Sequence, residues 1–286
     1  MSVVHLLLSK EGNSQEECED SLEYREDGSL FIAAIADGAS QGYESKLFSG
    51  LLCEHFVERF KESQEYDEKE LRGKFDHFLK EVIEAFNAAI MEKTRGRELK
   101  WYEENAIGNG SFSTFMGLVF DVGTKKGYLL SVGDCFLFQV KDAEMKTGEE
   151  DPEQVLRIYS ENHQEQSNTP YLLATNRLYN MKLPEYLFLS PITVENGEAL
   201  ILATDAFSYF LIDHTENIGI IKSIAKCDKS GLKRVVETGR RQKRLKNDDV
   251  AIIIKRFERL PMKEPNTLKA AEKSSFIMAR QENSPL

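Results

Sequence analysis

Four separated aspartates stand where apolar, strand-like runs of the sequence begin or end. Asp37 follows one such run, Asp134 lies in the turn after a second, Asp205 follows a third, and Asp248 comes just before a fourth. A carboxylate at the rim of a buried strand costs free energy unless charge or hydrogen bonds compensate it. Aspartate also favours turns and strand ends for local reasons, which would suffice for any one of these positions. Taken as a set, however, the four carboxylates indicate a bound cation, and all-oxygen ligands favour Mg²⁺ or Mn²⁺ over zinc.

Composition limits the class of protein. The chain has 286 residues, 41% of them hydrophobic, and a formal net charge of −11. This acidity argues against a nucleic-acid partner, because such proteins neutralise phosphates with clustered lysine and arginine. No apolar run reaches the length of a membrane span, and the four cysteines show no CxxC spacing. We therefore predict a cytoplasmic protein without a membrane partner, with one domain over residues 1–258 and a polar, loosely ordered tail over 259–286.

The periodicity of apolar residues predicts an α+β protein. Alternating or continuous apolar runs predict strands at 3–8, 21–26, 30–36, 111–121, 127–132, 136–141, 155–159, 186–194, 199–204 and 250–255. Apolar residues at helical spacing predict helices at 43–61, 68–93, 207–212, 218–226 and 229–238. The polar stretches 62–69, 94–109, 142–154 and 161–180 are interpreted as connectors. Because the helices come in groups and do not alternate with strands, a layered α+β fold is favoured over a parallel doubly wound sheet.

Five short acidic motifs follow one another over most of the chain. They are Glu19-Asp20, Asp37-Gly38, Gly133-Asp134, Thr204-Asp205 and Asp248-Asp249, with a small-residue segment at 110–114 before the third. In this order and spacing the chain resembles the metal-dependent (type 2C) protein phosphatases. The resemblance covers roughly residues 10–255 and is closest to a bacterial branch of the family, to which the segments 12–14, 36–40 and 168–173 are also similar. Any one of these motifs is weak, whereas five in order are specific.

The resemblance implies a fold and a metal centre. The fold would be a four-layer αββα sandwich, in which two antiparallel β-sheets are flanked by helix pairs. Two Mg²⁺ or Mn²⁺ ions would lie at one end, with Asp37 bridging them and the Gly38 carbonyl binding one. Asp205 and Asp248 would hold the other ion.

Three further acidic residues complete the implied metal centre. Glu19 and Asp20 would bind metal directly or through water, and Asp134 would hold a weaker third ion. The implied reaction is hydrolysis of phosphoserine or phosphothreonine in a protein substrate by a metal-activated water. Asp37, Asp205 and Asp248 would act in catalysis through that water, so no cysteine or serine nucleophile is required.

The chain departs from the family pattern around the substrate phosphate. Many members have an arginine shortly before the first acidic pair, but residues 13–17 include no basic residue. Asn13 or Gln15 would then bind phosphate through weaker neutral hydrogen bonds, unless Arg25 or Arg177 substitutes from elsewhere. A histidine that some members have after the Asp-Gly pair is also missing. These departures motivate an alternative: a catalytically weak or inactive phosphatase-like domain that binds a phosphorylated partner in signalling. A small phosphorylated molecule is a third possible substrate.

Two other features have competing interpretations. The basic run 239–246 precedes Asp248, and we interpret it as a solvated loop, with electrostatic guidance of phosphorylated substrates as the alternative. Trp101 and Tyr102 are interpreted as core residues in preference to a substrate-stacking pair. The sequence determines neither the physiological substrate, the opposing kinase, the metal, nor the oligomeric state.

Overall fold

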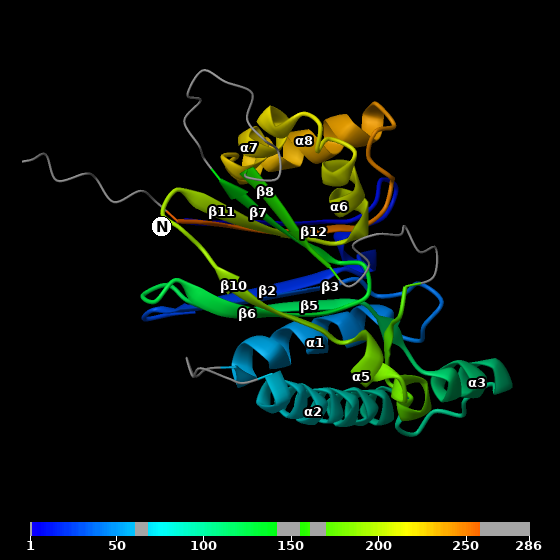
Figure 1. Ribbon diagram of the computed structural model, residues 1–286. Coiled ribbons are helices and arrows are strands. Elements are labelled where there is room, and N and C mark those ends of the chain that lie inside the picture. The colour runs from blue at the N-terminus through cyan, green and yellow to red at the C-terminus, as the bar shows by residue number, and fades with distance from the viewer. Residues whose placement is uncertain (1, 61–67, 142–154, 161–169, 258–286) are drawn as a thin grey trace, which may run out of the picture.

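Two five-stranded antiparallel sheets lie face to face, and helices cover both outer faces (Figure 1). The computed structural model describes residues 2–60, 68–141, 155–160 and 170–257. The arrangement confirms the predicted four-layer αββα sandwich and the α+β class.

The strands fall into three sheets. In spatial order the first sheet is β1 (Ser2–Leu8), β12 (Val250–Arg256), β11 (Glu198–Ala203), β7 (Phe136–Lys141) and β8 (Leu156–Tyr159). The second sheet is β10 (Phe188–Thr193), β6 (Lys126–Val132), β5 (Phe115–Asp121), β3 (Leu30–Ala36) and β2 (Ser21–Asp27). A small third sheet pairs β4 (Phe112–Ser113) with β9 (Leu173–Ala174).

The helices form the two outer layers and several short connections. The long helices α1 (Ser45–Arg59) and α2 (Glu68–Thr94) cover the second sheet, and α6 (Asp205–Ile212), α7 (Ile218–Ala225) and α8 (Lys229–Arg241) cover the first (Figure 1). The shorter elements are α3 (Trp101–Asn109), α5 (Leu183–Tyr186), η1 (Gln15–Glu17) and η2 (Arg177–Asn180). Within the described parts of the chain, no helix has both the length and the apolar character that crossing a membrane would require.

Three apolar interfaces hold the four layers together. One lies between the sheets, and the other two lie between each sheet and its helices. Strand β3 contributes to two of them: Phe31 and Ile35 point between the sheets, and Leu30 and Ile32 point toward α1 and α2. Because successive strand residues face opposite sides and both sides are covered, β3 has an unbroken apolar sequence.

The structure differs from the sequence predictions at several connections. The predicted connector 94–109 contains α3, which begins where the Lys100 N–H donates to the Glu103 carboxylate at 3.0 Å. Trp101 and Tyr102 lie on this helix with exposed fractions of 74% and 50%, so the prediction that they are core residues is wrong. The predicted strand 111–121 is divided into β4 and β5 at Thr114, whose N–H donates to the Asp37 carbonyl.

Other predicted connectors contain short elements or lie outside the described residues. The segment 161–180 includes β9 and η2. Residues 62–67, 142–154, 161–169 and the predicted tail 259–286 are outside the described residues.

Gly117 allows α1 to pack closely on the second sheet. The Phe56 ring of α1 lies over Gly117 of β5, and a Cβ there would meet ring carbons at 2.4 to 2.7 Å. The same ring packs against Phe60, Phe78 and Phe115, with ring centroids 4.3 to 5.8 Å apart. The position therefore requires a residue without a side chain.

Gly117→Ala is expected to lower the free energy of unfolding by about 1–3 kcal/mol, because the added methyl group overpacks this aromatic cluster. Gly73→Ala is the control, since nothing lies within 4 Å of a Cβ at Gly73 in α2. That change should stabilise the protein by up to about 1 kcal/mol through helix propensity. Urea unfolding of both variants checks the prediction, and a change of the same sign in both would contradict it.

Candidate metal centre

Antiparallel pairing gathers the predicted carboxylates at one edge of the sandwich. The end of β3 lies beside the start of β2, which places Asp37 next to Asp20. Strand β11 runs antiparallel to both β7 and β12. Asp134 and Asp248 precede the starts of those two strands, and they therefore lie at the edge where Asp205 follows the end of β11. Residues far apart in sequence thus meet because each lies at the same end of its strand.

These carboxylates are buried close enough to repel one another. Burial, followed by the charges of Asp205 and Asp134, raises the pKa of Asp37 to about 8. Burial and the charge of Asp205 raise the pKa of Asp134 to about 6. Burial and the charge of Asp37 raise the pKa of Asp20 well above its usual value. The pKa of Asp205 is also raised, by burial first, and Asp248 adds to the shifts of Asp37 and Asp205. The edge therefore needs positive charge if all five carboxylates are to be ionised together.

The backbone around Asp37 and Gly38 is held from several sides. The Asp37 N–H donates to the Thr114 hydroxyl at 3.1 Å, and the Ser113 hydroxyl donates to the Asp37 carbonyl at 2.8 Å. A Cβ at Gly38 would lie 2.8 Å from the Glu19 carbonyl oxygen. Only glycine fits there without displacing the backbone that carries Glu19.

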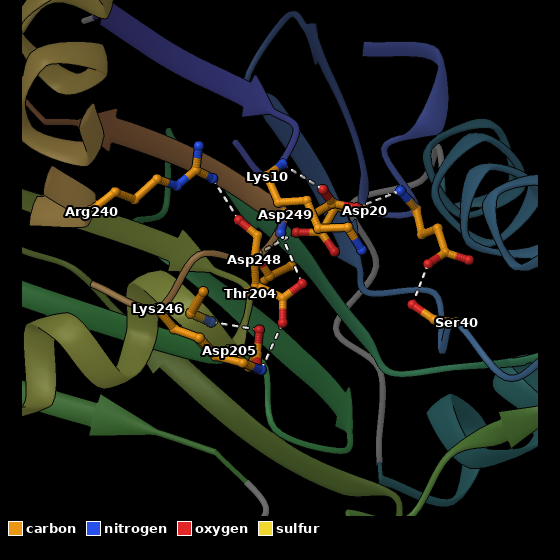
Figure 2. Close-up of polar contacts among 11 residues, drawn as sticks. Lys10, Asp20, Ser40, Thr204, Asp205, Arg240, Lys246, Asp248 and Asp249 are labelled. Atoms are coloured by element: carbon orange, nitrogen blue, oxygen red, sulfur yellow. Dashed lines mark hydrogen bonds and ion pairs between the residues drawn. The ribbon is translucent and has the colours of Figure 1, made fainter. Parts of the chain in front are cut away.

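Asp249 fixes the segment that carries Glu19. One carboxylate oxygen of Asp249 accepts from the Lys10 N–H at 2.8 Å and the other from the Glu19 N–H at 2.7 Å. Figure 2 shows Asp249 beside Lys10, with the polar contacts of Asp20 and Asp248 nearby. The Glu19 side chain accepts a hydrogen bond from the Ser40 hydroxyl. Asp249 was not predicted to have a role of its own, although its position directly after Asp248 was a signal.

Two hydroxyl groups that the sequence analysis did not single out support the aspartates. The Thr204 hydroxyl donates to Asp20 at 2.8 Å and accepts from the Ala251 N–H at 2.9 Å. The Tyr209 hydroxyl on α6 hydrogen-bonds Asp134, and burial followed by the charge of Asp134 raises the pKa of Tyr209 to about 12. Asp20 and Asp134 are therefore oriented by hydroxyl groups at the N-cap and within α6.

Part of the basic run 239–246 belongs to the carboxylate edge. Arg240 is 8% exposed, and its guanidinium donates to the carbonyls of Ser9 at 2.9 Å and Asp248 at 2.5 Å. The Lys246 ammonium lies 2.6 Å from a carboxylate oxygen of Asp248 and 3.4 Å from one of Asp205 (Figure 2). Burial lowers the pKa of Lys246, but its hydrogen bonds and the two carboxylate charges outweigh that effect and raise it overall. The interpretation of the run as a solvated loop is wrong for Arg240, which is buried on α8, whereas Lys246 is 64% exposed in the turn and also contacts the two carboxylates.

The candidate phosphate-binding residues, Asn13 and Gln15, lie between Lys10 and Glu19, whose N–H groups donate to Asp249. The Gln15 side-chain oxygen accepts from the Ser9 N–H at 3.4 Å, and the Asn13 N–H donates to the Lys10 carbonyl at 3.1 Å. Arg25 lies five residues beyond Asp20 along β2, roughly 16 Å away, so it does not substitute at this edge. It pairs with Asp27, and Arg177 pairs with Glu84 of α2 at 3.3 Å.

The clustered carboxylate oxygens are the kind of ligand that a hard divalent cation prefers, although they are not already arranged around one. Among the residues that the structure describes, no group of three or more His, Cys, Asp or Glu side chains could hold a metal ion in its present arrangement. Several carboxylate oxygens instead accept from protein donors: Asp205 from Lys246 and the Ala206 N–H, and Asp20 from Thr204. All the clustered groups are carboxylates, and the raised pKa values of Asp20, Asp37, Asp134 and Asp205 reflect burial first and then repulsion between neighbouring aspartates. Oxygen ligands of this kind are those that Mg²⁺ and Mn²⁺ prefer.

Comparison with known proteins establishes the family. The family model described as protein phosphatase 2C matches residues 10–237, and the chain belongs to that family. A comparison with curated protein sequences gave no significant match.

Solved structures of several phosphatases share the fold. A bacterial serine phosphatase bearing an R161E mutation superposes with a TM-score of 0.60 at 12% identity, covering 90% of this chain and 99% of the other. The serine/threonine phosphatase PstP from Mycobacterium tuberculosis gives 0.56 at 18% identity, covering 90% and 99%. The photosystem II phosphatase PBCP gives 0.56 at 15% identity, covering 91% and 99%. At such low identities these likenesses show the fold.

Asp37→Asn is expected to stabilise the protein in the presence of a chelator, by an amount that grows from about pH 4 to about pH 8. The pKa of Asp37 rises on folding from 3.8 to about 8. Between these two pKa values, the Asp37 carboxyl group has lost its proton in the unfolded chain but keeps it in the folded protein. The Asp37 contribution to wild-type stability is therefore fully present below pH 3.8 and is lost as the pH rises toward 8, by at most about 1.4 kcal/mol per pH unit. Asparagine does not titrate.

Thermal unfolding of wild type and variant at a series of pH values, with chelator present throughout, measures this difference. Asp213→Asn, at an exposed position after α6, serves as the control and should change stability by less than about 0.5 kcal/mol. A stability difference between Asp37→Asn and wild type that stays constant from pH 5 to pH 8 would contradict the prediction.

Proposed function

We propose that this protein hydrolyses phosphoserine or phosphothreonine in phosphorylated proteins, with two Mg²⁺ or Mn²⁺ ions at the carboxylate edge. The observation that carries the proposal is the meeting of five carboxylates at one edge of a sandwich that belongs to the protein phosphatase 2C family. One similar solved structure, with a TM-score of 0.55 and 16% identity, is the catalytic domain of PstP in complex with two manganese ions. That complex supports a divalent-metal requirement.

Each carboxylate has a proposed part in holding metal. Asp37 would contact both ions, the Gly38 carbonyl would be a further ligand, and Asp205 and Asp248 would hold one of the ions. Glu19 and Asp20 would bind directly or through water, and Asp134 would hold a weaker third ion. When bound, the ions supply an acidified water as nucleophile and offset negative charge on the phosphoryl oxygens.

The remaining residues of the edge position these ligands and the substrate. Asp249 and Arg240 hold the segment 9–19 against the start of β12. Asn13 and Gln15 on that segment are proposed as weak donors to the substrate phosphate. A phosphorylated protein is the proposed partner, and a cytoplasmic location without nucleic-acid or membrane partners remains a prediction.

Two observations favour a second candidate, a phosphatase-like domain that binds a phosphorylated partner and turns it over weakly or not at all. The chain has no basic residue at 13–17, and its Lys246 ammonium contacts two of the carboxylates that metal would need. Binding without hydrolysis would then serve signalling. Assays of free phosphorylated metabolites beside phosphopeptides separate both candidates from an enzyme that acts on small molecules, which would release phosphate faster from the metabolites.

Asp205→Asn is expected to reduce phosphate release from a mixed phosphopeptide pool by about 100-fold or more with saturating Mn²⁺, because the lost carboxylate is needed to hold the ion. Wild type should release phosphate with Mn²⁺ and lose that activity with chelator. The matched control is Asp213→Asn, which changes an exposed carboxyl beyond the other end of α6 and should keep wild-type activity. If wild type binds phosphopeptides tightly but releases no phosphate with Mn²⁺, the hydrolase proposal fails and the binding domain replaces it.

A further inference from the structure

Lys246 lies in the turn between α8 and β12 and contacts two carboxylates, Asp205 at the start of α6 and Asp248 just before β12. Its ammonium is 2.6 Å from an oxygen of Asp248 and 3.4 Å from an oxygen of Asp205 (Figure 2). The lysine side chain is 64% exposed, whereas those of Asp205 and Asp248 are 15% and 35% exposed. The ammonium thus lies on the solvent side of the edge and reaches inward to both carboxylates.

The backbone on both sides of Lys246 is anchored, which limits where its side chain can reach. The preceding Leu245 is buried among the residues packed under α8, and its N–H donates to the Gly239 carbonyl at 3.2 Å. The following Asn247 accepts from the Glu11 N–H at 2.7 Å. The Lys246 carbonyl accepts from the Asp248 N–H at 2.9 Å. A lysine held in this way presents its charge to Asp205 and Asp248 at a high effective concentration.

We propose that Lys246 is a tethered cation that competes with divalent metal for Asp205 and Asp248 and so sets how tightly that side of the edge binds metal. The inference rests on the proposed function, in which these two aspartates are metal ligands. A Mg²⁺ or Mn²⁺ ion needs ligand oxygens at about 2.0–2.2 Å, and an ammonium already bonded to the same oxygens both blocks that approach and repels the ion. Metal binding therefore requires Lys246 to release the two carboxylates.

The competition separates Lys246 from a residue with a merely structural role. Without metal the ammonium offsets the repulsion between Asp205 and Asp248, so its removal should destabilise the protein in chelator. When metal is added, the same removal should favour metal binding, because no bond between Lys246 and the two carboxylates has to be broken. If Lys246 had only a structural role, its removal would lower the stability of the protein both with and without metal and would leave the metal affinity unchanged.

Isothermal titration of the full chain with Mn²⁺ alone tests the proposal. Lys246→Met should bind Mn²⁺ about 10-fold more tightly than wild type, as expected for losing one nearby competing charge. Lys246→Arg, which keeps the charge, should stay near the wild-type affinity. Lys243→Met is the matched control, since it removes the same charge from an exposed position in the same turn. Thermal unfolding with chelator and with Mn²⁺ gives the second readout: Lys246→Met should melt below wild type in chelator and gain more on adding Mn²⁺.

An unchanged or weaker Mn²⁺ affinity in Lys246→Met, with wild type binding normally, would overturn the role of Lys246 and leave the proposed metal site intact. Equal tightening in Lys243→Met would also overturn it, because net charge would then account for the effect. If Lys246→Met does not fold, Lys246→Gln takes its place with the same expected direction. Absence of Mn²⁺ binding in wild type and every variant would overturn both this proposal and the proposed metal site.

Discussion

The electrostatic cost of gathering five carboxylates at one buried edge is the constraint on which the rest of this structure depends. Every contact around Asp20, Asp37, Asp134, Asp205 and Asp248 reduces that cost in part. Hydroxyl groups of Thr204 and Tyr209 donate to two of them, and the Lys246 ammonium lies against two others. The raised pKa values show that these donors do not compensate the charge completely. A fold that retains such an arrangement retains an affinity for added positive charge.

The apolar layers and the polar edge have separate tasks in this architecture. The three packed interfaces stabilise the sandwich, and they contain the strand interiors that carry the acidic residues at their ends. Because the layers are rigid and close-packed, the strand ends are held in fixed relation to one another. The acidic groups can therefore be kept close together although they destabilise the metal-free edge. Asp249 extends this rigidity to the segment 10–19 by accepting from two of its backbone N–H groups.

The basic turn before β12 links the edge to the helical layer. Arg240, near the end of α8, donates to the carbonyls of Ser9 and Asp248, and Lys246 contacts the carboxylates of Asp205 and Asp248. Within the same short run, Arg240 is thus a buried structural cation, whereas Lys246 is an exposed one. Their different surroundings explain why the prediction of a solvated loop does not hold for the whole run.

The sequence by itself determined the class, the layers and the identity of the clustered aspartates. Apolar periodicity depends on local alternation of buried and exposed faces, so β3, β11, α1 and α2 could be predicted from it. The order of the acidic motifs then indicated that their strand ends meet. Only the tertiary structure decided that Lys246 and Thr204 donate to those carboxylates and that Arg240 and Asp249 hold the backbone around them, because these contacts join segments up to 239 residues apart. It also decided that Trp101 is exposed, since burial depends on what packs against a helix and not on residue type alone.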